Sequence, residues 1–260
     1  MKSIINGVLT ENEVIENWKK KGNIYEVLRV IDNKPLFLRE HLSRLKRSEE
    51  TIDIELIQNE LVLLIKSLKE PLNNNIFISF NTETKGRGIF IIKGFYPPEE
   101  WYQNGIDINT YQIKRKNPNL KIYDDNYKRL IENHLKDTNV FETLITDEGI
   151  INEGSRSNVF FIKNNVVYTP SVEAVLPGIT RDKVFEAAKA SKIEIVEGPI
   201  YGKTLGEYEG AFITGTSIDL LPVRKIDEIQ LKTVEIDCFK RLMAGFMRIR
   251  NRDLDIENRE

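Results

Sequence analysis

Three segments of this 260-residue chain carry groups that could bind an anion. Ile179 and Thr180 follow Pro177-Gly178 at the start of an expected helix, where unpaired backbone N–H groups and the helix dipole favour a phosphate. Gly215-Thr216 ends an expected strand and offers a close-approach backbone and a hydroxyl. Arg44, on an expected helix of the first half, could add a fixed positive charge. Taken singly, each is more typical of an ordinary helix cap, turn or surface residue, so none establishes a site alone.

A fourth segment places an acid inside an apolar region. In the stretch INEGSRSNVFF, residues 151–161, Glu153 and the polar or small residues 154–157 separate two strand-like flanks. This pattern fits an ordinary connection between strands. It also fits an acid that holds a ligand.

Residues 1–95 predict a small α+β domain that would carry Arg44. Its β-branched, alternating segment at 24–31 is typical of a strand, and Leu38, Leu42 and Leu45 recur on one helical face. The expected elements are a strand at 24–31, helices at 38–52 and 54–70, and strands at 76–80 and 88–95. Pro71 is expected to end the second helix.

Residues 101–260 predict a larger, sheet-rich and barrel-like domain with a few helices. Pro97-Pro98 makes residues 96–100 an expected extended connector between the two domains. The expected strands are 105–113, 141–146, 159–162, 166–169, 193–198, 210–214 and 220–223, and the expected helices are 126–137, 181–191 and about 234–250. The predicted fold class is therefore a two-domain α/β (α+β) protein.

Composition limits the chemistry that is available. With 38 Lys and Arg against 40 Asp and Glu, the chain has no basic excess that would favour nucleic acid. It has no apolar run long enough to span a membrane and no signal-peptide core, so we expect a cytoplasmic protein. Cys238, His41 and His134 are its only cysteine and histidines, which argues against a disulfide or a bound metal. Any chemistry should rest on Lys, Glu, Arg, Tyr and hydroxyls, or on a cofactor.

Taken together, four segments resemble the class IV (fold type IV) pyridoxal-phosphate enzymes. These segments are LFLREHLSRLKRS, INEGSRSNVFFI, LPGITRDKVFE and FITGTSIDLLPV. The family includes branched-chain aminotransferases, D-amino-acid aminotransferases and aminodeoxychorismate lyases. The resemblance extends over nearly the whole chain from Ile24 onward, and it implies pyridoxal 5′-phosphate as cofactor.

The resemblance assigns the two central roles to Glu153 and Lys121. Glu153 would face the pyridine nitrogen and keep it protonated, because an adjacent negative charge favours the cationic form. Lys121 matches the family's Schiff-base lysine by its spacing, 32 residues before Glu153 and just ahead of an amphipathic helix. It would act as nucleophile and then as proton shuttle. Lys116 and Lys128 are the alternatives.

The remaining positions follow from the same resemblance. The phosphate would be held by Arg44, Ile179, Thr180, Gly215 and Thr216. Tyr25 matches an aromatic position that faces the active site, although a half-buried strand tyrosine is an equally good interpretation.

The sequence departs from the family pattern in three ways, all in the part of the active site that would contact the substrate. The glycine-rich segment that usually precedes the strand at Tyr25 is shortened to NWKKKGNIYEV, and Asp124 stands where asparagine is usual. The arginine–histidine pair that binds the substrate carboxylate in D-amino-acid aminotransferases has no clear match here, and Arg87 is only a weak substitute.

The resemblance predicts transamination between an amino acid and a 2-oxo acid. The alternatives are an aminodeoxychorismate lyase, which releases pyruvate and 4-aminobenzoate, and a non-catalytic cofactor-binding relative. A homodimer is expected by analogy.

Overall fold

The computed structural model describes residues 2–11 and 13–256, which form two compact units. The first unit contains the described residues of Met1–Phe95, Leu120–Asp125 and Arg250–Glu260. The second contains Tyr96–Asn119 and Asn126–Ile249. Lys121 therefore belongs to the first unit, although the chain reaches it only after entering the second.

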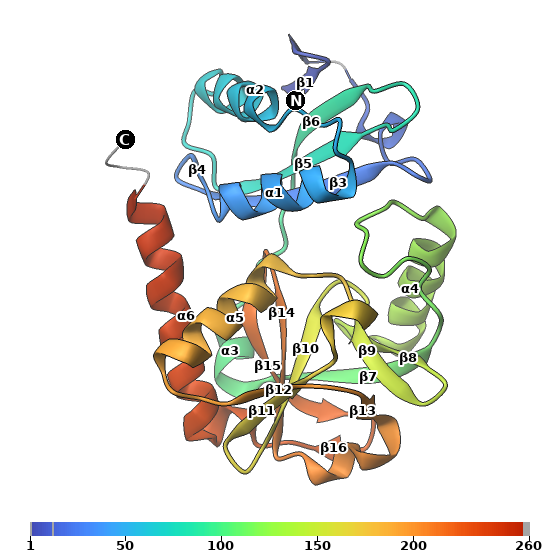
Figure 1. Ribbon diagram of the computed structural model, residues 1–260, viewed down its shortest axis with the longest axis vertical. Helices are drawn as coiled ribbons and strands as arrows, with labels where there is room; N and C mark the ends of the chain where they lie inside the picture. Colours follow the sequence, from blue (N-terminus) through green and yellow to red (C-terminus); the bar gives the residue numbers. More distant parts are fainter. Residues whose placement is uncertain (1, 12, 257–260) are drawn as a thin grey trace. The chain divides into compact units, whose positions relative to one another are not determined.

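The first unit is a six-stranded sheet with two helices (Figure 1), in the strand order β2-β1-β6-β5-β3-β4. Its elements are β1 (Ser3–Ile5), β2 (Val8–Thr10), the short 3-10 helix η1 (Ile15–Asn17), β3 (Ile24–Ile31), β4 (Lys34–Pro35), α1 (Leu38–Ser48), α2 (Ile54–Lys66), β5 (Asn74–Phe80) and β6 (Arg87–Ile92). β3 pairs with β5, and β5 with β6, in antiparallel register.

The core of this unit lies between the sheet and its helices. Along β3, buried and half-buried residues alternate, so that Leu28 and Val30 enter the core with Leu45 of α1 and Leu64 of α2. Burying a leucine side chain fully contributes about 1.5–3 kcal/mol. Tyr25 lies on the other face of the strand.

α1 begins at an unusual backbone position. Phe37 precedes the helix in the left-handed region, with φ of 53°, and no side chain caps the helix there. The Phe37 amide instead donates a 2.7 Å hydrogen bond to Oδ2 of Asp253, a residue from the end of the chain that belongs to the same unit. This hydrogen bond helps to fix the start of the helix that carries Arg44.

The second unit contains a ten-stranded sheet in the order β12-β11-β10-β14-β15-β7-β8-β9-β13, with β16 paired to β15. Its elements are α3 (Glu99–Asn104), β7 (Ile106–Gln112), α4 (Asp125–Thr138), β8 (Thr143–Asp147), β9 (Ile150–Gly154), β10 (Asn158–Lys163), β11 (Val166–Thr169), η2 (Val172–Ala174), α5 (Ile179–Ala190), β12 (Ile195–Glu197), β13 (Ile200–Tyr201), η3 (Gly202–Glu207), β14 (Gly210–Gly215), β15 (Asp219–Ile226), β16 (Ile229–Gln230), η4 (Thr233–Glu235) and α6 (Asp237–Ile256). Because β9 also lies beside β10, the sheet curls into a barrel-like form.

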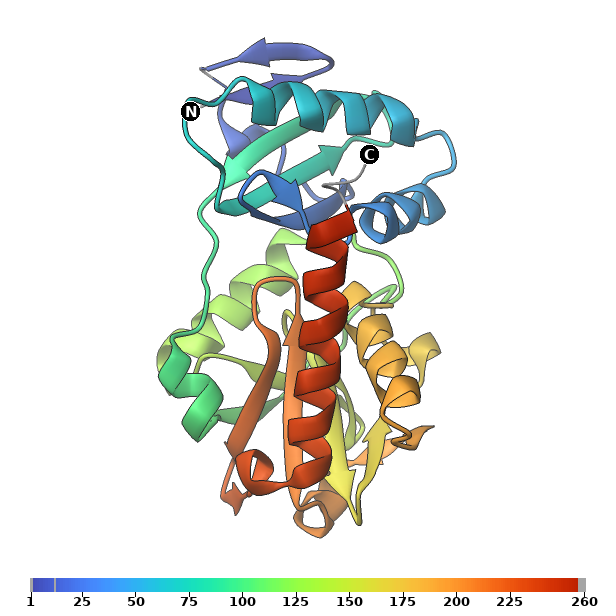
Figure 2. The same ribbon diagram turned by 90° about the vertical axis from the view of Figure 1, so that its left-hand side faces the viewer.

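Aromatic side chains connect this sheet to two helices. Figure 2 shows α6, in red, along the strands β14 and β15. Phe212 of β14 stacks on Phe160 of β10 at 5.0 Å between ring centroids and meets Phe239 of α6 at 5.4 Å. α5 approaches α6 closely, since a Cβ on Gly245 would lie 3.2 Å from Cβ of Ala187. The large aromatic side chains fill the space between the sheet and α6. Small residues allow α5 and α6 to approach each other closely.

The fold class expected from the sequence is confirmed, with differences at particular elements. β3 has the expected bounds, whereas α1 ends at Ser48 and α2 at Lys66, both earlier than expected. The hairpin of β1 and β2 was not predicted. Glu153 and Gly154 are the last residues of β9 rather than part of a connection, so the turn between strands is confined to residues 155–157.

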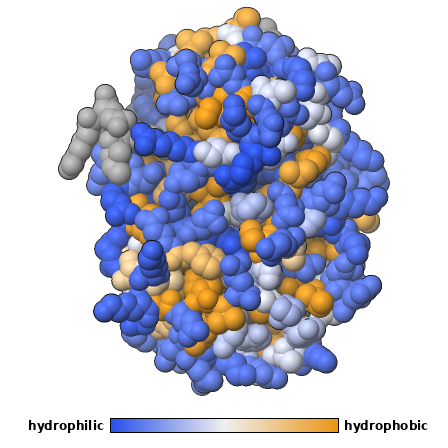
Figure 3. Space-filling view, viewed as in Figure 1, coloured by the Kyte–Doolittle hydropathy of each residue, from blue (hydrophilic) through white to orange (hydrophobic). Residues whose placement is uncertain are grey.

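The surface is mainly polar. On the face in Figure 3, hydrophilic residues predominate and hydrophobic ones form small separate groups. Within residues 2–11 and 13–256, no helix combines the length and the apolar character needed to cross a bilayer.

Candidate functional site

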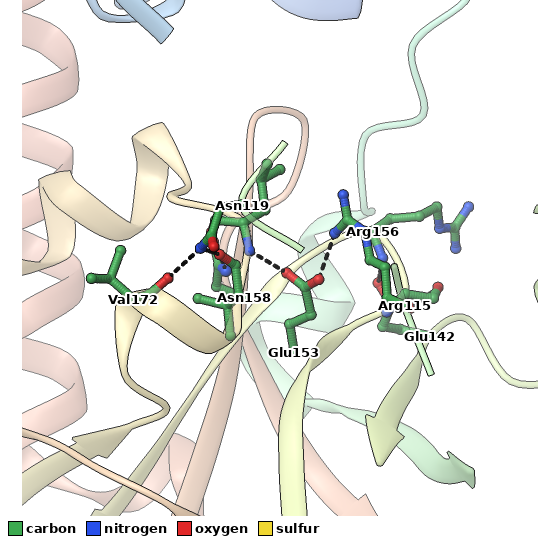
Figure 4. A network of polar contacts seen from close by, with 10 residues as sticks. Arg115, Asn119, Glu142, Glu153, Arg156, Asn158 and Val172 are labelled. Atoms are coloured by element: carbon green, nitrogen blue, oxygen red, sulfur yellow. Dashed lines mark hydrogen bonds and ion pairs between the residues drawn. The ribbon is translucent and has the colours of Figure 1, made fainter. Parts of the chain in front are cut away.

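Glu153 is a buried carboxylate that contacts Arg115 and the Leu176 amide in the second unit. Its side chain is 4% exposed, and its Oε1 lies 2.5 Å from Nη1 of Arg115. Its Oε2 accepts a hydrogen bond of 3.0 Å from the Leu176 amide. Figure 4 shows Arg115 and Glu153 pointing toward one another. A buried carboxylate keeps its charge when a cation and N–H donors stabilise it, so this environment favours an ionised Glu153.

Two asparagines hold the segment that supplies the Leu176 amide. Nδ2 of Asn119 donates to the carbonyl oxygens of Val172 and Val175, at 2.8 Å each. Nδ2 of Asn158 donates to the carbonyl oxygen of Leu176 at 2.9 Å. Both asparagines appear in the network of Figure 4. They fix the backbone that lies against Glu153.

Asn158 also joins this network to the start of α5. A Cβ added to Gly178 would lie 2.0 Å from Oδ1 of Asn158, so the two residues approach as closely as a glycine permits. Gly178 is the N-cap residue of α5, and it has no side chain that could cap the first turn. Ile179 and Thr180, both buried, open the helix there. The backbone N–H groups at this helix start are thus suited to bind an anion.

The predicted anion-binding segment Gly215-Thr216 lies at the end of β14, the strand that pairs with β10. Asn158 of β10 pairs with Thr214 of β14, which immediately precedes Gly215-Thr216. Thr214 is buried, and its hydroxyl has no hydrogen-bond partner among the described residues. A Cβ on Gly215 would lie 3.7 Å from the Arg156 carbonyl oxygen of the turn after Glu153. The structure therefore brings Glu153, the α5 start and Gly215 together around Asn158.

Lys121 and Tyr25 lie together in the first unit. The Tyr25 amide donates a 3.0 Å hydrogen bond to the Lys121 carbonyl oxygen, and Nζ of Lys121 is 4.9 Å from the centre of the Tyr25 ring. Phe77 stacks on Tyr25 at 5.5 Å, and Tyr123 meets it edge-on at 5.8 Å. Lys121 is thus half-buried, with its amine over the ring of Tyr25.

Arg44 is buried in the same unit, with 5% of its surface exposed, and it is paired with Glu26. Nε and Nη2 of Arg44 each lie 2.7 Å from an oxygen of Glu26. His41 Nδ1 lies 2.9 Å from the same carboxylate. Burial alone would raise the pKa of Glu26, but the charge of Arg44 and the hydrogen bonds from both partners hold that pKa far below its usual value. Burial also lowers the pKa of His41.

The sequence analysis did not identify Arg115, Asn158 or Glu26 as functional candidates. One signal was available for Glu26, because a charged residue at an inward position of the alternating strand β3 requires a buried partner. Arg87 is held by Glu60, whose two oxygens lie 2.9 and 3.0 Å from its Nε. This pairing assigns Arg87 to the packing of α2 against β6.

Comparisons with known proteins agree on one family. Residues 23–226 match the family model described as amino-transferase class IV. A candidate branched-chain-amino-acid aminotransferase from Methanocaldococcus jannaschii is 30% identical over 88% of this chain and 87% of its own. The D-alanine aminotransferase of Bacillus licheniformis is 28% identical over 87% of this chain and 89% of its own. The branched-chain amino acid aminotransferase of T.th., solved with pyridoxamine 5′-phosphate, has a TM-score of 0.81 at 20% identity and covers 96% of this chain and 94% of its own.

Proposed function

Because this chain belongs to the class IV amino-transferase family, we propose that it is a pyridoxal-5′-phosphate-dependent aminotransferase. It would move an amino group between an amino acid, branched-chain or of the D-amino-acid type, and a 2-oxo acid. The observation that carries the proposal is the second unit's buried Glu153, placed beside an uncapped helix start and Gly215. This arrangement supports the proposal, because the acid could serve a ring nitrogen and the backbone amides could bind a phosphate.

The residues present fit this cofactor chemically. Glu153 would accept a hydrogen bond from the pyridine nitrogen. The backbone amides at Ile179, Thr180 and Gly215 and the Thr216 hydroxyl would hold the phosphate. The unpaired Thr214 hydroxyl in the same strand shows that polar groups here are not all satisfied within the described residues.

Two residues of the first unit complete the proposed set. Arg44 would add a positive charge for the phosphate, held in one orientation by Glu26. Tyr25, beside Lys121, would contact the substrate.

When bound, the cofactor supplies an electron sink for the carbon that loses its proton. The protein's own contribution is the Lys121 amine, which would hold the cofactor and would accept the proton from Cα of the substrate. For this the amine must be uncharged when it reacts. Glu153, held ionised by Arg115, would keep the ring nitrogen in its protonated state.

Cofactor trapping tests the assignment of Lys121. The purified protein, loaded with pyridoxal 5′-phosphate and reduced with borohydride, should carry the label on the peptide that contains Lys121. Lys121→Ala should remove the label, whereas the matched controls Lys116→Ala and Lys128→Ala should retain it. A label on Lys116 or Lys128, or no visible absorbance with the cofactor, would contradict the proposal.

Substrate assays separate the proposed reaction from its alternatives. We expect amino transfer from branched-chain or D-amino acids to a 2-oxo acid. Pyruvate release from aminodeoxychorismate without any 2-oxo acid acceptor would identify a lyase. Cofactor binding without a spectral change on adding any amino donor would identify a non-catalytic relative.

Two further expectations accompany the proposed function. By analogy with the family we propose a homodimer, which light scattering of the purified protein at micromolar concentration would test. We also propose a cytoplasmic location, for which fractionation of the source cells is the test.

A further inference from the structure

A second buried acid lies next to the turn that follows Glu153. Glu142 precedes β8 and is 1% exposed. Its carboxylate accepts hydrogen bonds from three backbone amides, those of Thr143 and Ser155 at 3.0 Å and of Arg156 at 3.2 Å. It also accepts from the Ser155 hydroxyl and, at 2.9 Å, from the Ser157 hydroxyl. Figure 4 places Glu142 in the same network as Glu153.

These five hydrogen-bond donors stabilise the buried Glu142 carboxylate, which a cation would otherwise have to do. Among the described residues, Glu142 has no ion pair with a lysine, arginine or histidine. A buried charge without a cation is costly unless several donors surround it. Glutamine could not serve equally well, because its NH2 group would face N–H and O–H groups that need an acceptor. The site is therefore built for a carboxylate.

The donors belong almost entirely to one turn, residues 155–157. The turn is closed by a 2.7 Å hydrogen bond from the Gly154 amide to the Ser157 carbonyl oxygen, and the Ser155 amide also donates to the Thr143 carbonyl oxygen. Gly154 has no room for a side chain, since a Cβ would lie 2.0 Å from Oγ of Ser157 and 3.3 Å from the Glu142 carboxyl. Glu142 thus fixes the backbone immediately after Glu153.

The strand that carries Glu153 needs such a support. β8 and β9 pair with a register shift between Ile145 and Thr146, so that Ile145 faces Glu153 while Thr146 faces Ile151. The shift leaves Asn152 without a cross-strand partner, which is the pattern of a β-bulge. A bulge changes the direction of the next side chain, here that of Glu153. Glu142 and the turn at residues 155–157 hold the end of β9 that follows the bulge.

We propose that Glu142 is a positioning residue that sets the direction of the Glu153 carboxylate and thereby the protonation state of the cofactor's ring nitrogen. The inference rests on the proposed function, because it assigns Glu153 to that nitrogen. It also gives the turn a second property: the Ser155 and Arg156 amides are bound to Glu142, so they do not belong to the groups proposed to hold the phosphate.

The test uses full-length protein loaded with pyridoxal 5′-phosphate that is ¹⁵N-labelled in the ring. In the wild type, the ¹⁵N chemical shift should be that of a protonated ring nitrogen. In Glu142→Gln, it should move toward the unprotonated value, because the displaced Glu153 no longer favours the cation. Affinity for the cofactor, measured by titrating the apoprotein, should fall about tenfold, as expected for losing a hydrogen bond to a charged group.

Glu148→Gln is the matched control. It removes one negative charge from the exposed turn between β8 and β9, without touching residues 155–157. Its ¹⁵N shift and affinity should equal those of the wild type. Thermal unfolding of each apoprotein shows whether the variants are folded.

The outcomes separate this inference from the proposed function. If the wild type does not bind the cofactor, both fail. If the wild type binds with a protonated ring nitrogen and folded Glu142→Gln has the same shift and affinity, only the role of Glu142 is overturned. Should Glu142→Gln not fold, Ser157→Ala decides, because it keeps the acid and removes one donor. In Ser157→Ala, a ¹⁵N chemical shift that moves toward the unprotonated value, by less than expected for Glu142→Gln, supports the proposal. A ¹⁵N chemical shift equal to that of the wild type overturns it.

Discussion

At the scale of single residues, the arrangement around Glu153 shows how a buried acid is kept charged. One oxygen faces a guanidinium and the other a backbone amide. The pairing with Arg115 neutralises part of the negative charge that the ring nitrogen would experience. The position of Glu153, and not only its charge, must therefore matter for its proposed role.

Replacing Glu153 by glutamine tests that role directly. Glu153→Gln keeps the shape of the side chain and removes its charge, so we expect the turnover number to fall about 100-fold, equivalent to about 2.7 kcal/mol of transition-state stabilisation. Steady-state kinetics at saturating cofactor provide the measurement. Cofactor affinity should fall less, by about tenfold as for Glu142→Gln, because the residues proposed to bind the phosphate are untouched. A turnover number within about threefold of the wild type would exclude the role.

A glycine substitution tests the junction at Asn158. In Gly178→Ala, the new methyl group would lie 2.0 Å from Oδ1 of Asn158, so the amide must move and lose its hydrogen bond to Leu176. We expect the free energy of unfolding to fall by about 1–3 kcal/mol, as for other overpacked sites. Urea denaturation measures this change.

Gly198→Ala is the matched control for this substitution. A Cβ at Gly198 would meet nothing within 4 Å, so the free energy of unfolding should stay the same or rise slightly. If Gly178→Ala and Gly198→Ala are equally stable, the Asn158 side chain can move without lowering the free energy of unfolding.

At the scale of elements, β3 and α1 are joined by the group of Glu26, His41 and Arg44. β3 presents Glu26 on its inward face, and α1 brings the other two residues onto it one helical turn apart. Arginine and histidine at this spacing lie on the same helix face. The group fixes the guanidinium that is proposed to bind phosphate, and it makes this pair of elements sensitive to pH.

The pKa shifts in this group predict the direction of that sensitivity. His41 has a folded-state pKa below its ordinary value of 6.5, so the unfolded chain binds a proton first as the pH falls. Glu26 has a folded-state pKa below its ordinary value of 4.5, with the same consequence at lower pH. The free energy of unfolding should therefore decrease as the pH falls below about 6.5 and decrease further below about 4.5.

Urea denaturation between pH 7 and pH 4 provides the measurement. In His41→Asn, which retains a hydrogen-bond donor for Glu26, the decrease between pH 6.5 and pH 5 should be smaller than in the wild type. The two slopes should differ by at most about 1.4 kcal/mol per pH unit, the limit for one proton. Identical slopes would mean that His41 does not contribute to the pH dependence.

At the scale of the whole molecule, binding of the cofactor should change the stability of the fold. Lys121, Arg44 and Tyr25 belong to the first unit, and Glu153, Ile179, Thr180, Gly215 and Thr216 to the second. A ligand that binds only the folded protein stabilises it by mass action. Pyridoxal 5′-phosphate at 100 times its dissociation constant should raise the free energy of unfolding by about 2.7 kcal/mol.

Thermal unfolding with and without cofactor measures this effect. Pyridoxal, which lacks the phosphate, should raise the melting temperature less at the same concentration, because the amides of the α5 start would have no anion to bind. Arg44→Met is not a suitable control, since it would leave Glu26 buried without its cation. An unchanged melting temperature with pyridoxal 5′-phosphate would argue against the proposed set as a whole.

The sequence alone was sufficient for the family and the fold class, and it predicted the elements with a regular pattern. Periodicity is a local property, so the alternation of residues 24–31 and the leucine stripe of α1 identify their elements before any tertiary contact forms. Irregular and very short elements, such as the hairpin of β1 and β2, were missed because three-residue strands carry too little periodic signal. The roles of Lys121, Glu153 and the phosphate-binding residues came from resemblance, and they stay predictions.

Only the tertiary structure decided which groups surround those residues. Arg115 reaches Glu153 across 38 residues, Asn158 meets both Leu176 and Gly178, and Glu142 gathers the turn after β9. Such contacts depend on the register of β8 against β9 and on the curling of the sheet, and neither is visible in a local pattern. A buried charge is specified by its partners in space, and the fold must bring those partners together before the charge can be kept.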